Sequence, residues 1–113
     1  MQSLRHQNVY FPSYSIHFLD SEDFILLIRN WVETNKPIGT CFTFSLNSED
    51  NIAILILNRV KERLENATAG KKCINIPMRT SAILNISYFR DTATRLYLRM
   101  TVVQSSKLGI KIT

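Results

Sequence analysis

The side chains with the most chemistry to offer alternate along one segment in the last third of the sequence. Arg95, Tyr97 and Arg99 occupy every second position, and apolar residues alternate with them at Leu96, Leu98, Met100 and Val102. This period of two predicts a strand over 96–102, with the apolar residues in a core and the arginines and tyrosine on the opposite face. Guanidinium groups pair with phosphate and stack on bases, and a tyrosine ring is a platform for base stacking. The pattern therefore favours a surface that binds single-stranded nucleic acid.

Other basic and polar residues extend this predicted nucleic-acid surface. The preceding alternating segment contributes Asn85 and Ser87, and cationic residues flank the two segments at Arg79, Arg90, Lys107 and Lys111. The arginines and lysines would capture the phosphate backbone while Tyr97 stacks on an exposed base, and no cofactor is required. RNA and DNA single strands fit this chemistry equally. The sequence has no RNP1 pattern, so the surface would differ from that of an RRM.

The charge of the chain is distributed unevenly. The 113 residues carry a formal charge of +5, but residues 1–70 hold six basic and eight acidic residues, a balance of −2. Residues 71–113 hold eight basic residues against Asp91 alone, a balance of +7. A concentrated positive charge favours anionic partners without specifying a fold. Nucleic acid is the first such partner, and an acidic protein is the second.

A non-enzymatic protein-interaction module is the alternative function. Tyrosine and arginine also dominate protein interfaces, so the same face could dock on an acidic protein, as part of an oligomer, an adaptor or an inhibitor. Such a module could instead use exposed apolar residues, for which the candidates are Tyr10, Phe11, Ile54 and Leu55. A nucleic-acid binder should show one continuous positive surface around Tyr97. An interaction module should show an apolar patch with basic residues at its rim.

Enzymatic and metal chemistry are less favoured. Cys41 or Cys73 could in principle pair with His6 or His17, but no spacing brings a nucleophile and a base together, so the sequence predicts no enzyme. The two cysteines lack the spacing of a metal or redox site and are expected as reduced thiols in a core.

Acidic residues recur at two predicted helix starts. Asp20, Asp23 and Glu49 are oxygen ligands of the kind that Mg²⁺ prefers, yet carboxylates at such positions more commonly stabilise the helix dipole. No metal site is therefore predicted.

A repeated stretch organises the predicted fold. Leu-Asp-Ser-Glu-Asp at 19–23 and Leu-Asn-Ser-Glu-Asp at 46–50 each separate an alternating apolar segment from a helix-like one. Asp20 and Asn47 are predicted as N-cap residues, because their short side chains can accept from the first free amides of a helix. Strands are expected at 13–19 and 40–46. Helices follow, one to about Asn35 and the other to Gly70, which is predicted as its C′ residue.

The second half of the sequence predicts an antiparallel meander. Strands are expected at 73–76, 82–88 and 96–102, with a last short strand at 108–112. With residues 1–12 as an N-terminal arm and 13–113 as a single domain, the fold class is α/β to α+β. The expected order is βαβαβββ, a mixed sheet whose two helices cross between parallel strands.

Hydropathy favours a soluble, cytoplasmic protein. The first residues contain no apolar stretch typical of an export signal, and the longest apolar run, 52–57, is far too short to span a membrane.

Overall fold

Six strands form one mixed sheet in the computed structural model, which describes residues 8–11, 16–46, 48–79 and 81–105. Across the sheet the order is β1 (Asn8–Phe11), β2 (Cys41–Leu46), β6 (Leu96–Gln104), β5 (Ala82–Arg90), β4 (Cys73–Pro77) and β3 (Thr68–Gly70). Only β1 and β2 pair in parallel, and every other neighbouring pair is antiparallel. The described chain is a single domain of the α+β class, as the sequence predicts.

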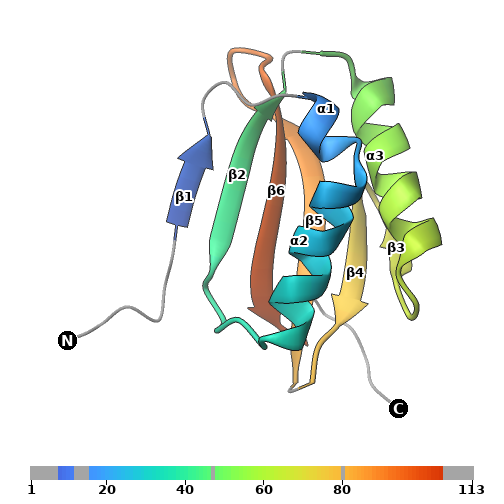
Figure 1. The fold of residues 1–113 in the computed structure, drawn as a ribbon. Coiled ribbons are helices and arrows are strands. Elements are labelled where there is room, and N and C mark those ends of the chain that lie inside the picture. The colour runs from blue at the N-terminus through green and yellow to red at the C-terminus, as the bar shows by residue number, and fades with distance from the viewer. Residues whose placement is uncertain (1–7, 12–15, 47, 80, 106–113) are drawn as a thin grey trace.

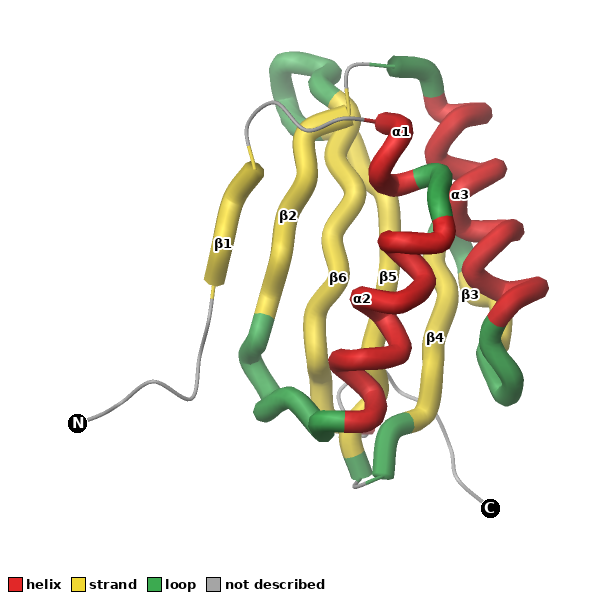
Figure 2. Tube along the Cα trace, viewed as in Figure 1, coloured by secondary structure: helices red, strands yellow, loops and turns green. Residues whose placement is uncertain are grey.

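The helices all lie on one face of this sheet, as Figures 1 and 2 show for α1 (Ile16–Leu19), α2 (Glu22–Glu33) and α3 (Asp50–Arg63). The core fills the space between the two layers. On the sheet side it contains the predicted inward residues of β6 together with Leu84 and Ile86 of β5, all of them at most 1% exposed. On the helix side the apolar stripes of α2 and α3 close the core with Phe24, Ile28, Trp31, Ala53, Ile56 and Val60.

An aromatic group anchors the β1 and β2 edge of the sheet to the helices. The Phe11 ring of β1 stacks on Phe44 of β2, with ring centroids 4.8 Å apart. Phe42 lies edge-on to Trp31 of α2 at 4.9 Å, and Phe44 packs against Phe24 at 6.1 Å. Such edge-on and offset contacts add to the burial of large apolar rings. They secure a parallel edge strand that has only four residues.

The strand predicted over 13–19 is wrong for 16–19, the part that the structure describes. Residues 16–19 form α1, and the strand at this end of the chain is β1, within the predicted arm. Ser21 rather than Asp20 caps α2, because its Oγ accepts from the Asp23 amide and donates to the Phe18 carbonyl at 2.6 Å. A segment this short satisfies both strand and helix spacing, and this local capping favours the helical turn.

The second helix also begins and ends differently from the prediction. Glu49 occupies the N-cap position of α3 without a side-chain hydrogen bond, whereas Asn47 lies outside the described residues. The helix ends at Arg63, and Asn66 turns the chain with a φ of 67° into β3. Gly70 is therefore a strand residue rather than a C′ residue, and a Cβ there would lie 2.7 Å from the Cys73 sulfur. A side chain at position 70 would crowd the Cys73 thiol unless that thiol moved, so this glycine fits the pairing of β3 with β4 rather than a helix terminus.

The expected pair of parallel crossovers is correct only in part. The α1 and α2 helices do connect the parallel neighbours β1 and β2. The α3 helix leads from β2 to β3, which the successive antiparallel pairings make parallel to β2 but place at the far edge of the sheet. The strand predicted to follow this helix, at 73–76, belongs to β4 and is antiparallel to β2. The strand expected at 108–112 lies outside the described residues. No described helix is long and apolar enough to cross a membrane.

Leu98 and Leu55 provide a matched test of this core. Leu98 is 0% exposed in the central strand, whereas Leu55 is 58% exposed on α3. Leu98→Ala should lower the free energy of unfolding by about 2–5 kcal/mol, because it leaves a cavity in a packed core. Leu55→Ala should change it by about 0.5 kcal/mol or less. Urea denaturation of both variants measures the difference, and equal losses would contradict this placement of the core.

Candidate functional site

The face of the sheet opposite the helices is covered by no described element (Figure 1). Two rows of side chains run across all six strands on this open face, as the strand register shows. The first row consists of Tyr10, Thr43, Arg99, Ser87, Cys73 and Gly70. The second consists of Asn8, Cys41, Thr101, Asn85, Asn75 and Thr68. Among the described strand residues that share this face, Arg99 carries the only charge. The open face therefore offers mainly uncharged hydrogen-bonding groups.

Three rings and one guanidinium group form a cluster at one end of the open face. Phe89 of β5 and Tyr97 of β6 are cross-strand partners whose rings stack with centroids 5.3 Å apart. The Arg99 guanidinium carbon lies 4.4 Å from the centre of the Phe89 ring, a cation–π geometry. Tyr10 reaches over from β1 to 6.1 Å from Tyr97 and is itself 51% exposed. We refer to Tyr10, Phe89, Tyr97 and Arg99 as the aromatic–arginine cluster.

The expected exposure of Tyr97 is wrong. This residue does face away from the helices, but it is only 9% exposed because Phe89 and Tyr10 flank its ring. A hydrogen bond with Tyr10 and burial raise the pKa of the Tyr97 hydroxyl, and its bond to Asp91 adds to the shift. The exposed ring that could stack on a ligand is therefore Tyr10. The sequence places Tyr10 among partner-interface candidates, and only the register shows that it lies beside Tyr97.

Asp91 fixes the hairpin that presents this cluster. One of its carboxylate oxygens accepts the backbone N–H groups of Ala93 and Arg95, each at 2.9 Å, and the other accepts from the Tyr97 hydroxyl at 3.1 Å. The bond from the Arg95 amide is the strongest of the effects that hold the pKa of Asp91 below its ordinary value, and partial burial opposes them. Asp91, the one acidic residue in 71–113, is thus a structural part of the turn.

The predicted basic residues do not form one continuous surface within the described chain. Arg99 lies on the open face, and Arg95 is exposed in the adjacent hairpin. Arg90 belongs to the helix-facing side, where its guanidinium lies 2.8 Å from Asp50 and bonds the Thr94 carbonyl. Arg79 is in the turn before β5, at the opposite end of that strand. Lys107 and Lys111 lie outside the described residues.

Asparagine side chains extend the open face toward β4. The predicted Asn85 donates through its amide to Asn75 of the adjacent strand at 2.7 Å. The two residues are directly paired, and Thr101 is the partner of Asn85 on the other side. Asn75 and Thr43 are missed by the sequence reasoning, because their position beside Asn85 and Arg99 depends on strand pairing.

The four apolar interface candidates do not form one patch. Ile54 and Leu55 are exposed on the outer side of α3, 43% and 58% respectively, as an interface would require. Tyr10 lies on the opposite side of the molecule, on the open face. Phe11 alternates with Tyr10 and packs into the core on Phe42 and Phe44, so its expected exposure is wrong.

The comparisons with known proteins leave the function open. A family model described as "Domain of unknown function (DUF3557)" matches residues 1–48. This match covers less than half of the chain and spans β1, α1, α2 and β2. No curated protein and no solved structure matches the sequence. Three of the four residues of the aromatic–arginine cluster lie beyond the matched part.

The other predicted chemical groups also have defined positions. Cys41 and Cys73 are free thiols, but both are half-buried on the open face rather than in the core, with the two strands β6 and β5 between them. His17 is exposed on α1. Within the described ranges, no group of three or more histidine, cysteine or acidic side chains is arranged to hold a metal ion. This finding applies to Asp20, Asp23 and Glu49 as well.

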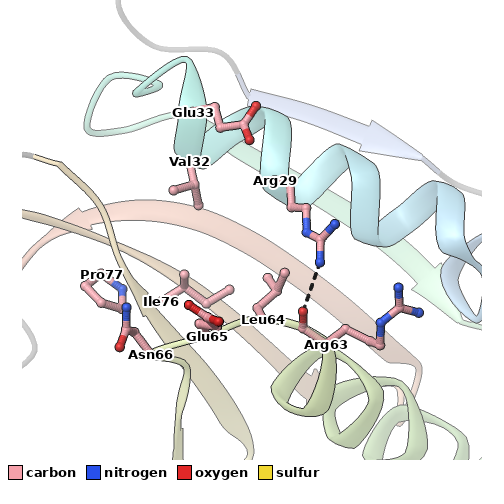
Figure 3. Close-up of a pocket in the computed structure, with 9 residues that line it drawn as sticks. All are labelled: Arg29, Val32, Glu33, Arg63, Leu64, Glu65, Asn66, Ile76 and Pro77. Atoms are coloured by element: carbon pink, nitrogen blue, oxygen red, sulfur yellow. Dashed lines mark hydrogen bonds between the residues drawn. The ribbon is translucent and has the colours of Figure 1, made fainter.

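A cleft opens on the helical side of the molecule (Figure 3). It has a volume of about 480 Å³ and lies between α2, the end of α3 and the end of β4. Its position is opposite to the open face. The two surfaces can therefore be tested separately.

The lowered pKa of Asp91 predicts a pH-dependent contribution to stability. The unfolded chain takes up the proton at an ordinary aspartate pKa, about 4, before the folded protein does. Wild type should therefore be more stable than Asp91→Asn at neutral pH, and this advantage should shrink as the pH falls from about 5 toward 2. Urea midpoints measured across that range test the effect. Tyr97→Phe should remove only part of the advantage, and an advantage that stays constant on acidification would contradict the prediction.

Proposed function

We propose that the protein is a protein-interaction module that docks the open face of its sheet on a partner protein. The observation that carries the proposal is the open face, which no described element covers, with the aromatic–arginine cluster at one end and uncharged hydrogen-bonding rows beside it. Tyrosine and arginine are the residue types that contribute most at interface centres, and charged residues are depleted there. This composition matches the open face.

The chemistry of the cluster supports a partner that presents a carboxylate. The Arg99 guanidinium rests on Phe89, which orients it and leaves its edge available for hydrogen bonds. Arginine binds carboxylates through parallel N–H bonds, and the flat Tyr10 ring beside it offers apolar contact area at low entropic cost. Because the face provides no strand carboxylate of its own, an acidic partner suits it better than a second copy of the same face. We thus favour a hetero-partner over a symmetric dimer.

Nucleic acid fits the described surface less well. Phosphate binding depends on several cations acting together, and here Arg90 is neutralised by Asp50 while Arg79 lies at the far end of β5. Eight of the nine acidic residues lie in or beside the helices, so the sheet side is the less acidic side of the molecule. Arg95 and Arg99 could still contact a strand whose base stacks on Tyr10. A titration with nucleic acid therefore tests this alternative on the same variants.

The free thiols support a reducing location. Cys41 and Cys73 remain unpaired on the partly accessible open face. Such thiols persist in the cytoplasm more readily than in oxidising compartments. We therefore place the proposed interaction in the cytoplasm.

The test is affinity capture from cells that express the protein, followed by titration of the recovered partner. Tyr10→Ala and Arg99→Ala remove the exposed parts of the cluster, and Lys61→Ala on the exposed side of α3 is the control. Each cluster variant should weaken binding of the purified partner by about tenfold, the effect of an interface residue worth about 1.4 kcal/mol. Lys61→Ala should leave the affinity unchanged, and all three variants should keep the wild-type free energy of unfolding within about 1 kcal/mol.

Nuclease treatment and a nucleic-acid titration discriminate the alternative. Labelled single-stranded RNA and DNA are titrated at several salt concentrations and followed by fluorescence anisotropy. Affinity that falls linearly on a log–log salt plot and drops in Arg99→Ala would replace the protein-docking proposal with nucleic-acid binding. A partner that binds all three variants equally would place its contact outside the open face and overturn the proposal.

A further inference from the structure

The cleft on the helical side arises because α2 extends past the end of α3. Arg63 ends α3, and the Arg29 guanidinium of α2 donates to its backbone carbonyl at 3.1 Å, which joins the two helices at this level. Beyond this bond α2 continues for another turn without a neighbouring helix. Figure 3 shows Val32 on that turn pointing toward the chain that follows α3. The resulting space of about 480 Å³ is in the size range of ligand pockets.

The floor of the cleft is apolar. Leu64 and Ile76 are 8% and 3% exposed, and Val32 and Pro77 complete the apolar surface between the helix and the end of β4. Asn66 lies beside Pro77 at the edge (Figure 3). Its side-chain amide forms no hydrogen bond with the described residues. The cleft therefore combines an apolar base with an available hydrogen-bonding group.

The ionic groups around the cleft differ in how far they are already satisfied. The Arg63 guanidinium is bonded to Glu22, which also bonds Arg59 at 3.1 Å. Arg29 is engaged by the carbonyl at the C-terminal end of α3, where a positive charge is favourable. Glu33 and Glu65 line the cleft and form no ion pair within the described part of the chain. The charges left to recruit a ligand are therefore carboxylates.

We propose that this cleft binds a lysine or arginine side chain of a partner polypeptide. The aliphatic stem would lie on Leu64, Ile76 and Pro77, and the cationic head would meet the Glu65 carboxylate. Long cationic side chains bury their stems along apolar surface while the head keeps polar contacts, which matches this arrangement of floor and rim. A charge-assisted hydrogen bond to a carboxylate would fix the head. Repulsion from Arg29 favours the end of the cleft formed by Glu65 and Asn66.

The proposal for the cleft and the proposal for the open face can be disproved independently. The cleft opens on the helical side of the sheet, and none of its residues belongs to the aromatic–arginine cluster or to the two rows of the open face. Loss of cleft binding would leave the proposed docking face intact, and the reverse also holds.

The experiment is an NMR titration of the full chain with fragments of the two side chains. The probes are n-butylammonium for lysine and n-butylguanidinium for arginine, with butyrate as the anionic control and butanol as the uncharged control. Methyl signals of Val32, Leu64 and Ile76 report on the cleft. Glu65→Gln removes the carboxylate that is proposed to bind, whereas Glu62→Gln removes an exposed carboxylate of α3 that does not line the cleft.

The proposal expects saturable shifts of these methyl signals with one or both cations. Glu65→Gln should raise the dissociation constant roughly three- to fivefold, the effect of losing one partly exposed ion pair, and Glu62→Gln should leave it unchanged. The cation with the lower dissociation constant identifies lysine or arginine as the preferred residue. Equal binding of butyrate or butanol, no shift with any probe, or an equal effect of the two variants would overturn the proposal.

Discussion

The structure depends on the alternation of side chains along β6. This strand lies between β2 and β5, and its inward residues, Leu96, Leu98, Met100 and Val102, are at most 1% exposed. Because these residues are buried under the helices, the alternation of side chains along a strand places the residues between them on the opposite face. Tyr97 and Arg99 must face away from the core, and the neighbouring strands must bring Thr43 and Ser87 beside Arg99. The open face is thus a consequence of how the core is built.

Elements with long, regular periodicity could be predicted from the sequence. The hairpin of β5 and β6, strand β2 and the buried faces of α2 and α3 all follow from apolar spacing. The first helix, α1, could not be predicted, because the apolar residues of 16–19 satisfy strand spacing and yet form a helix that Ser21 stabilises. The end of α3 was also missed. Apolar spacing continues past Arg63 through Leu64 and Ala67, so periodicity alone does not show where the helix gives way to β3.

The site was harder to predict than the fold because side-chain partners are set by tertiary contacts. Alternation correctly places Arg99 on the outer face, but it cannot show that Phe89 supports its guanidinium. Likewise, Arg90 counts as a free cation in the sequence, although the structure pairs it with Asp50, forty residues away. Tyr97 loses its exposure to Tyr10, which comes from the other end of the chain. Charge and aromatic content identify the right region, whereas the available groups are known only once partners are assigned.

The central position of β6 has a consequence for how the protein is made. This strand is the last one described, yet β2 has no other antiparallel partner, so the first half of the chain cannot join the sheet until residues 96–104 have been synthesised. Until then Phe42 and Phe44 lack the strand that covers their flank. Pairing over so long a stretch of sequence carries a high loop-closure cost and slows folding. The nascent chain would therefore present an aromatic surface until β6 has emerged from the ribosome, the kind of intermediate that chaperones bind.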